Sequence, residues 1–108
     1  MAGIVTPETF TPVDHLSREV QIDRAEFLRQ LPAAVGDRPF SVEGNVITVQ
    51  DGAGRARIRM TELGVKQLGQ LDLPMMRIDF DFTGLSDEKV QAFMVDYDQR
   101  TLRGAGGM

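Results

Sequence analysis

The sequence predicts an α+β domain: an antiparallel sheet of four to five strands with two helices packed on one face, in the order β-α-β-β-β(-β)-α. Three observations predict it. In residues 75–82 one apolar row, Met76, Ile78, Phe80 and Phe82, alternates with a second row, Met75, Arg77, Asp79 and Asp81. In residues 55–60 apolar side chains alternate with Arg55, Arg57 and Arg59. Such a period of two indicates strands with one buried and one solvated face. Two further segments carry apolar residues at helical spacing.

Opposite charges mark the solvated faces of these two strands. If the strands are neighbours, the arginine row lies across from the aspartate row, where opposite charges favour pairing. Because short turns join the successive strands, the pairing is antiparallel. The inner faces and both helical stripes need cover, so we expect the helices to share one side of the sheet.

The first half of the domain is predicted to be a strand followed by a helix. The strand covers residues 16–22, and Arg18 interrupts its inner row, as charged residues do on edge strands. Asp23 and Glu26 have the spacing of a capping box at the start of the helix. Pro32 would remove a hydrogen bond from a straight helix. We therefore expect a kink or restart near Leu31 and an end before residue 36.

The second half is predicted to hold three further strands and a helix. Residues 40–43 and 46–50 flank Gly44-Asn45, which suits a tight turn. A third strand follows from residue 55 to about 63, and the alternating segment 75–82 comes after it. The stretch 64–72 fits either a short strand or an irregular loop. The second helix starts at Ser86 and ends at Gly104, with a stripe formed by Val90, Phe93, Met94 and Tyr97.

A length of 108 residues suits one domain, which we place at residues 14–103. We expect residues 1–13 to form a flexible arm, because their prolines and threonines show no period. Residues 104–108 are rich in glycine and are expected to form a flexible tail.

Composition excludes several classes of function. The chain has a net charge of −4 and no cysteine, which disfavours nucleic-acid binding and excludes disulfides and thiolate metal sites. No signal peptide and no apolar stretch of about 20 residues is present, so we expect a cytoplasmic protein without a membrane partner.

Catalytic patterns are weak. His15, the only histidine, lies beside the arm, and no Gly-x-Ser-x-Gly motif is present. Asp79 and Asp81 stand about 7 Å apart on one strand face, but nearby arginines would repel a cation. An enzyme using these two aspartates needs a carboxylate with a raised pKa in a cleft. We therefore expect no metal, no cofactor and no enzymatic activity.

The leading hypothesis is a domain that acts through protein contact, with a partner or as a homodimer. Alternating arginine and aspartate side chains would suit a twofold contact of one patch with its own copy. The candidate interaction face comprises Arg55, Arg57, Arg59, Met75, Arg77, Asp79 and Asp81.

The alternative is a domain that binds a small hydrophobic ligand. A curved sheet that grips the C-terminal helix can enclose an apolar cavity between the two. Its walls would be Met60, Met76, Phe80, Phe93 and Met94, although the same residues suit a solid core.

Overall fold

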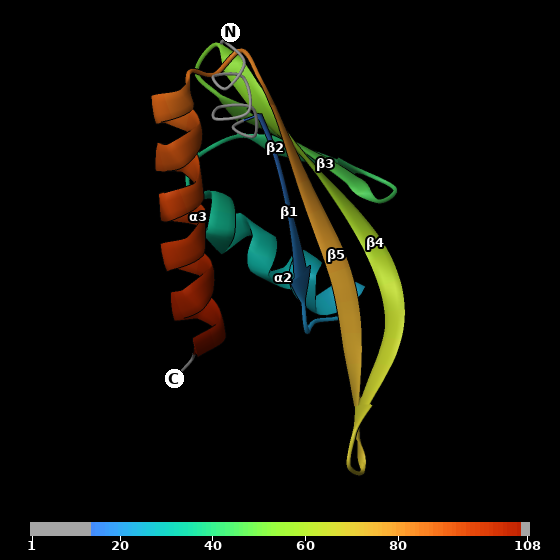
Figure 1. Ribbon diagram of the computed structural model, residues 1–108. Coiled ribbons are helices and arrows are strands. Elements are labelled where there is room, and N and C mark those ends of the chain that lie inside the picture. Colours follow the sequence, from blue (N-terminus) through green and yellow to red (C-terminus); the bar gives the residue numbers. More distant parts are fainter. Residues whose placement is uncertain (1–13, 107–108) are drawn as a thin grey trace, which may run out of the picture.

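A computed structural model describes residues 14–106 and confirms the α+β class. Five antiparallel strands form one sheet in the order β1-β5-β4-β3-β2 (Figure 1). The strands are β1 (His15–Val20), β2 (Phe40–Glu43), β3 (Val46–Asp51), β4 (Gly54–Leu68) and β5 (Leu71–Thr83). The helices are α2 (Arg24–Val35) and α3 (Asp87–Gly106).

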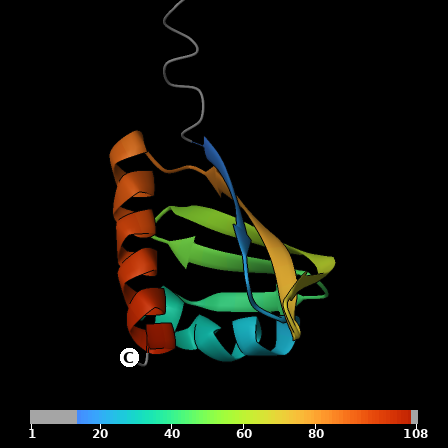
Figure 2. The same cartoon turned by 60° about the horizontal axis from the view of Figure 1, so that its bottom comes forward.

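Both helices lie on the same side of the sheet, with α2 directed across α3 (Figures 1 and 2). The core fills the space between these layers, and its burial follows the predicted alternation. On β5, Met76, Ile78, Phe80 and Phe82 are all buried. Their partners on the helices are also buried and include Phe27, Leu31, Val90, Phe93, Met94 and Tyr97.

The charged rows of β4 and β5 lie across from each other, as expected. Arg57 pairs with Asp81 and Arg59 with Asp79 across the two strands. The close side-chain contacts of these aspartates nevertheless form with other residues. Asp81 Oδ1 lies 2.6 Å from Nδ1 of His15 on β1, and Asp79 Oδ2 lies 3.4 Å from Nε of Arg77 on its own strand. Within the described range, neither Arg57 nor Arg59 makes an ion pair within 4.0 Å.

The stretch 64–72, which fitted either a strand or a loop, is strand on both sides of a tight turn. β4 continues to Leu68 and β5 begins at Leu71, with a register irregularity between Glu62 and Gly64. β4 and β5 extend beyond the ends of β1 and β3. There they form a two-stranded ribbon, residues 62–74, that projects past the helices (Figure 1). An isolated two-stranded hairpin is marginally stable in water.

Both helices differ in detail from expectation. α2 is one helix with Pro32 inside it, so no restart occurs near Leu31. Leu31, Ala34 and Val35 are buried on both sides of the proline, and this burial outweighs the missing hydrogen bond. The Asp23 side chain accepts a hydrogen bond from the Glu26 backbone N–H at 2.8 Å.

The second helix is longer than expected. The Ser86 hydroxyl accepts a hydrogen bond from the Lys89 backbone N–H at 3.2 Å and caps its start. The helix runs to Gly106 and so passes Gly104, where an end was expected. The expected arm at residues 1–13 and the last residues of the expected tail, 107–108, lie outside the described range. Neither α2 nor α3 is long and apolar enough to cross a bilayer, as far as their described residues show.

Candidate functional site

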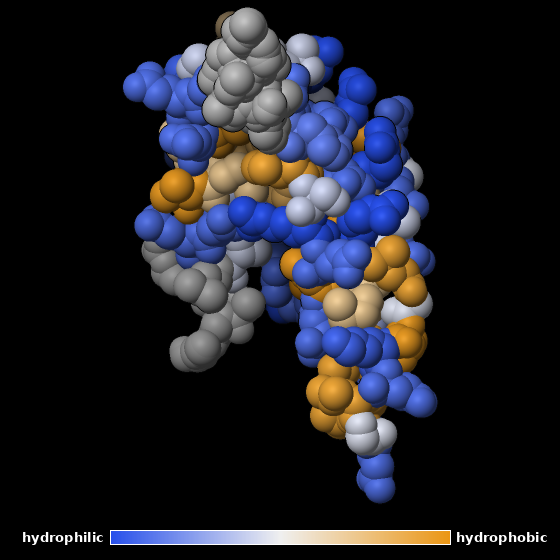
Figure 3. All heavy atoms as spheres, viewed as in Figure 1, coloured by the Kyte–Doolittle hydropathy of each residue, from blue (hydrophilic) through white to orange (hydrophobic). Residues whose placement is uncertain are grey.

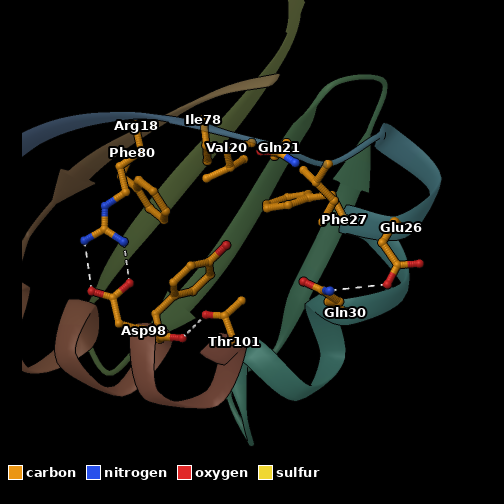
Figure 4. Close-up of a pocket in the computed structure, with 12 residues that line it drawn as sticks. Arg18, Val20, Gln21, Glu26, Phe27, Gln30, Ile78, Phe80, Asp98 and Thr101 are labelled. Atoms are coloured by element: carbon orange, nitrogen blue, oxygen red, sulfur yellow. Dashed lines mark hydrogen bonds and ion pairs between the residues drawn. The ribbon is translucent and has the colours of Figure 1, made fainter. Parts of the chain in front are cut away.

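A cavity of about 530 Å³ lies between the β1–β5 side of the sheet and the two helices (Figure 4). Its wall is mainly apolar and includes Val20, Ile22, Phe27, Ile78, Phe80 and Tyr97. Its polar lining residues are Arg18, Gln21, Glu26, Gln30, Asp98 and Thr101. Small-molecule sites in proteins span roughly 300–1,000 Å³ and combine apolar walls with a few polar groups.

The relative placement of the helices explains why this space is not filled. The C-terminal end of α2 packs closely on α3, since a Cβ on Gly36 would come within 2.9 Å of the Arg100 guanidinium carbon. The N-terminal half of α2 runs away from α3 (Figure 2). Glu26, Phe27 and Gln30 of this half therefore face α3 across a wedge, and the wedge is the cavity.

An ion pair closes one end of the cavity. Both terminal nitrogens of Arg18 on β1 donate to the Asp98 carboxylate on α3, with 2.9 Å between Nη2 and Oδ2 (Figure 4). Hydrogen bonding to Asp98 raises the pKa of the Arg18 guanidinium against the opposing effect of its partial burial. The guanidinium carbon of Arg18 lies 6.0 Å from the centre of the Phe80 ring. The aliphatic part of the Arg18 side chain therefore covers the apolar wall.

A single tyrosine supplies a polar group in the interior. Tyr97, the only tyrosine of the chain, is buried and packs edge-on against Phe80 with 5.2 Å between the ring centres. Burial raises the pKa of its hydroxyl well above the ordinary range. Among the described side chains, none forms a hydrogen bond with this hydroxyl.

That hydroxyl opens onto the cavity. No fully enclosed side-chain oxygen or nitrogen in the described range lacks a hydrogen-bond partner. Because the Tyr97 hydroxyl has no such partner, it must keep accessible surface, and the cavity is the space that Tyr97 lines. One turn later, the Thr101 hydroxyl donates to the Tyr97 backbone carbonyl and is thereby occupied within the helix.

The opposite end of the cavity is also polar, and its charge is compensated. Glu26 pairs with Arg29 one turn along α2, and this hydrogen bonding lowers the pKa of the Glu26 carboxyl. The Gln30 amide donates to Glu26 Oε2 at 3.3 Å. Figure 4 shows Glu26 and Gln30 at this end and Arg18 with Asp98 at the other.

Most of the residues that the sequence predicts as cavity walls lie elsewhere in the structure. Of the five, Phe80 lines it, whereas Met60, Met76, Phe93 and Met94 are buried in the solid core. Most of the omitted lining residues come from β1, α2 and the segment that joins them. One signal in the sequence pointed to them: Arg18 occupies the inner row of its strand, where an apolar side chain would have filled the space.

The residues of the expected interaction face all lie on the side of the sheet that the helices leave open. Arg55, Arg57, Arg59 and Arg77 are exposed, whereas Met75, Asp79 and Asp81 are partly covered. His15 extends this face as the first residue of β1 and is about half exposed. None of the residues of this face lines the cavity between the sheet and the helices.

The ribbon carries exposed apolar side chains that the sequence reading did not single out. They are Leu63, Val65, Leu68 and Leu71, with 41–62% of each residue exposed. Figure 3 shows hydrophobic residues at the surface of this projection. Exposed apolar groups that gather in this way mark contact surfaces more often than single exposed residues do.

A metal site finds no support in the described part of the chain. There, no three histidine or acidic side chains are placed to hold a metal ion together. Comparison of the chain with protein-family models, with curated proteins and with solved structures finds no match in any of the three. The cavity between the sheet and the helices is therefore the feature from which a function is inferred.

Proposed function

We propose that this protein binds a small apolar molecule in the cavity between β1, β5, α2 and α3. The observation that carries the proposal is the volume of about 530 Å³ bounded mainly by apolar side chains. A space of this size admits a ligand of two to three fused rings or a medium-length acyl chain. Burial of apolar ligand surface contributes roughly 25 cal/mol per Å², which gives such a site its driving force.

The polar groups of the site support binding more than catalysis. Arg18 is engaged by Asp98, and Glu26 is engaged by Arg29 and Gln30. No nucleophile stands beside a base in the described lining, as covalent catalysis would require. A carrier or ligand sensor therefore accounts for the arrangement.

A neutral, environment-sensitive dye tests the proposal. N-phenylnaphthylamine fluoresces in apolar surroundings, and we expect it to bind the full chain in saturable fashion with one site per molecule. Thr101→Phe, which places a ring in the cavity, should weaken dye binding at least tenfold. Val95→Phe is the matched control, because Val95 lies on the same helix and is 56% exposed.

A second control separates the cavity from the ribbon. Leu68→Ser combined with Leu71→Ser should leave dye binding unchanged, since both side chains lie outside the cavity lining. Dye binding that survives Thr101→Phe but disappears in the ribbon variant would rule out the cavity as the binding site.

A second candidate function is contact with another protein or with a second copy of this chain. The exposed apolar side chains of the ribbon favour it, together with the arginine and aspartate rows on the open face of the sheet. Light scattering after size-exclusion chromatography tests the homodimer. A monomer at high micromolar concentration in both low and high salt would exclude it.

A further inference from the structure

We infer that the ligand is an uncharged apolar molecule bearing a hydrogen-bond acceptor, such as a ketone, ester or quinone carbonyl, which the Tyr97 hydroxyl recognises. This inference rests on the proposed function, because it concerns the same cavity. It depends on two observations. One is the balance of charge in the lining, and the other is the hydroxyl of the buried Tyr97, which has no hydrogen-bond partner among the described residues. The Gln21 amide also lines the cavity without such a partner, but Gln21 is exposed to solvent.

The charge balance disfavours an anionic ligand. The charged lining residues are Arg18, Glu26 and Asp98, and therefore one cation stands against two anions. The one cation already forms a two-point ion pair with Asp98. A carboxylate or phosphate entering the cavity would have to displace Asp98 or remain uncompensated in apolar surroundings, which is costly.

A cationic ligand is disfavoured for a similar reason. Glu26 and Asp98 are each held by an arginine, so no free carboxylate faces the apolar middle of the cavity. Between the two ends the wall consists of Val20, Phe27, Ile78 and Phe80 (Figure 4). An apolar, uncharged body is the chemical class that this wall accepts.

Tyr97 supplies the specificity. Its ring is fixed by edge-on packing against Phe80 and by a near-parallel contact with Phe93 at 6.3 Å. Its hydroxyl opens onto the cavity without a partner among the described residues, as argued above. A bound ligand covers this hydroxyl, and a covered hydroxyl without a partner is unfavourable, so a ligand that supplies an acceptor gains over one that does not. Burial keeps the phenol protonated, and hence it donates.

Three naphthalene probes of the same shape test the inference. 2-Acetylnaphthalene carries a carbonyl, 2-isopropenylnaphthalene replaces its oxygen with a methylene group, and 2-naphthoate carries a charge. Their dissociation constants are measured by displacement of N-phenylnaphthylamine from the full chain. ¹³C-labelled tyrosine gives one set of ring resonances from Tyr97, and their shifts report whether each probe reaches it.

The informative quantity is the affinity ratio of the acetyl and isopropenyl probes. We expect Tyr97→Phe to shift this ratio about fivefold toward the isopropenyl probe. This shift corresponds to the loss of one hydrogen bond between the Tyr97 hydroxyl and the carbonyl of the acetyl probe. Thr61→Val is the matched control: it removes a hydroxyl on β4, outside the cavity lining, and should leave the ratio unchanged. 2-Naphthoate should bind at least tenfold more weakly than 2-acetylnaphthalene.

The outcomes distinguish this inference from the proposed function. If none of the probes binds, the proposed function fails and the inference fails with it. If the neutral probes bind and Tyr97→Phe leaves the ratio unchanged, the cavity still binds apolar molecules but Tyr97 does not select them. If 2-naphthoate binds as tightly as the ketone, the conclusion that the ligand is uncharged is overturned.

Discussion

Arg18 and Asp98 form a two-point ion pair that joins the edge strand β1 to helix α3 at one end of the cavity. The two side chains are 39% and 46% exposed, so the pair stabilises the fold by less than about 1 kcal/mol. Its larger effect is on the electrostatics of the site. Asp98 compensates the one positive charge in the lining, and we propose that it thereby sets the charge preference of the cavity.

The first prediction follows from this compensation. Asp98→Asn leaves Arg18 without its anionic partner, and the affinity for 2-naphthoate should then rise about fivefold. The affinity for the neutral 2-isopropenylnaphthalene should stay the same. Displacement titrations with N-phenylnaphthylamine measure both. An equal change for the two probes would show that the substitution altered the shape of the cavity and not its charge.

The buried side of the sheet was predictable because a period of two leaves little choice of face. Ile58, Ile78 and Phe80 are buried as the alternation requires, and a slip of one residue would expose all of them. The arginine and aspartate rows also lie across from each other as expected, with Arg57 opposite Asp81. The close contact of Asp81 forms instead with His15, because β1 places the imidazole beside the carboxylate.

The ribbon and the cavity were not predictable from local patterns. Strand pairing in residues 64–72 depends on a bulge near Gly64 and a turn at residues 69–70, and alternation does not reveal either. The cavity depends on the direction of α2 relative to α3, which is a tertiary property. Arg18 was the one local sign of the cavity. An inward charge on an edge strand is, however, also explained by the need to discourage pairing with other chains.

The second prediction concerns the ion cluster around Arg38. Its guanidinium contacts Asp51 at 3.1 Å and Asp96 at 2.9 Å, and it stacks 4.9 Å from the centre of the Phe93 ring. Hydrogen bonding to Arg38, and then to Arg100, lowers the pKa of the Asp96 carboxyl. The folded state thus favours ionised Asp96, and this stabilises the fold above the ordinary pKa of about 4.

Asp96→Asn should therefore lower the free energy of unfolding by about 1 kcal/mol at neutral pH, a value reduced for the partial exposure of the carboxylate. The difference from the wild type should shrink as the pH falls below the ordinary pKa of about 4 and be lost once the pH has passed below the lowered pKa of Asp96. Urea unfolding of both proteins at a series of pH values measures this difference in the free energy of unfolding. Asp37→Asn, at an exposed site without an ion pair in the described range, should change stability by less than about 0.5 kcal/mol.

The third prediction concerns the contact between the start of β4 and the loop before α3. A Cβ on Gly54 would lie 2.6 Å from the backbone oxygen of Gly84 and 2.7 Å from Leu85 Cδ2. Gly54→Ala should therefore destabilise the protein by about 1–3 kcal/mol, as overpacking does. Ala53→Ser, in the same turn but exposed, should have little effect. Equal urea midpoints for the two variants would show that the loop at Gly84 and Leu85 shifts to make room for the methyl group without loss of stability.

The fourth prediction separates the ribbon from the core. Leu68 and Leu71 pair across the ribbon and are 56% and 60% exposed. Replacing both by serine should change the free energy of unfolding by less than about 1 kcal/mol, whereas Leu31→Ala in the core should cost about 2–5 kcal/mol. If the chain self-associates through the ribbon, light scattering should show that the double variant is monomeric. A large loss of stability in that variant would mean that the ribbon is packed against the body.

The fifth prediction uses the single tyrosine as a reporter. Burial raises the pKa of Tyr97, so the folded state holds the phenolic proton more tightly than the unfolded state. The stability that this provides is complete below the ordinary pKa of about 10 and is lost as the pH rises above it. The urea midpoint of the wild type should therefore fall above about pH 10, more steeply than that of Tyr97→Phe. The ultraviolet absorbance of tyrosinate should appear only as the chain unfolds, and tyrosinate formed near pH 10 in the folded protein would show that the hydroxyl is open to bulk water.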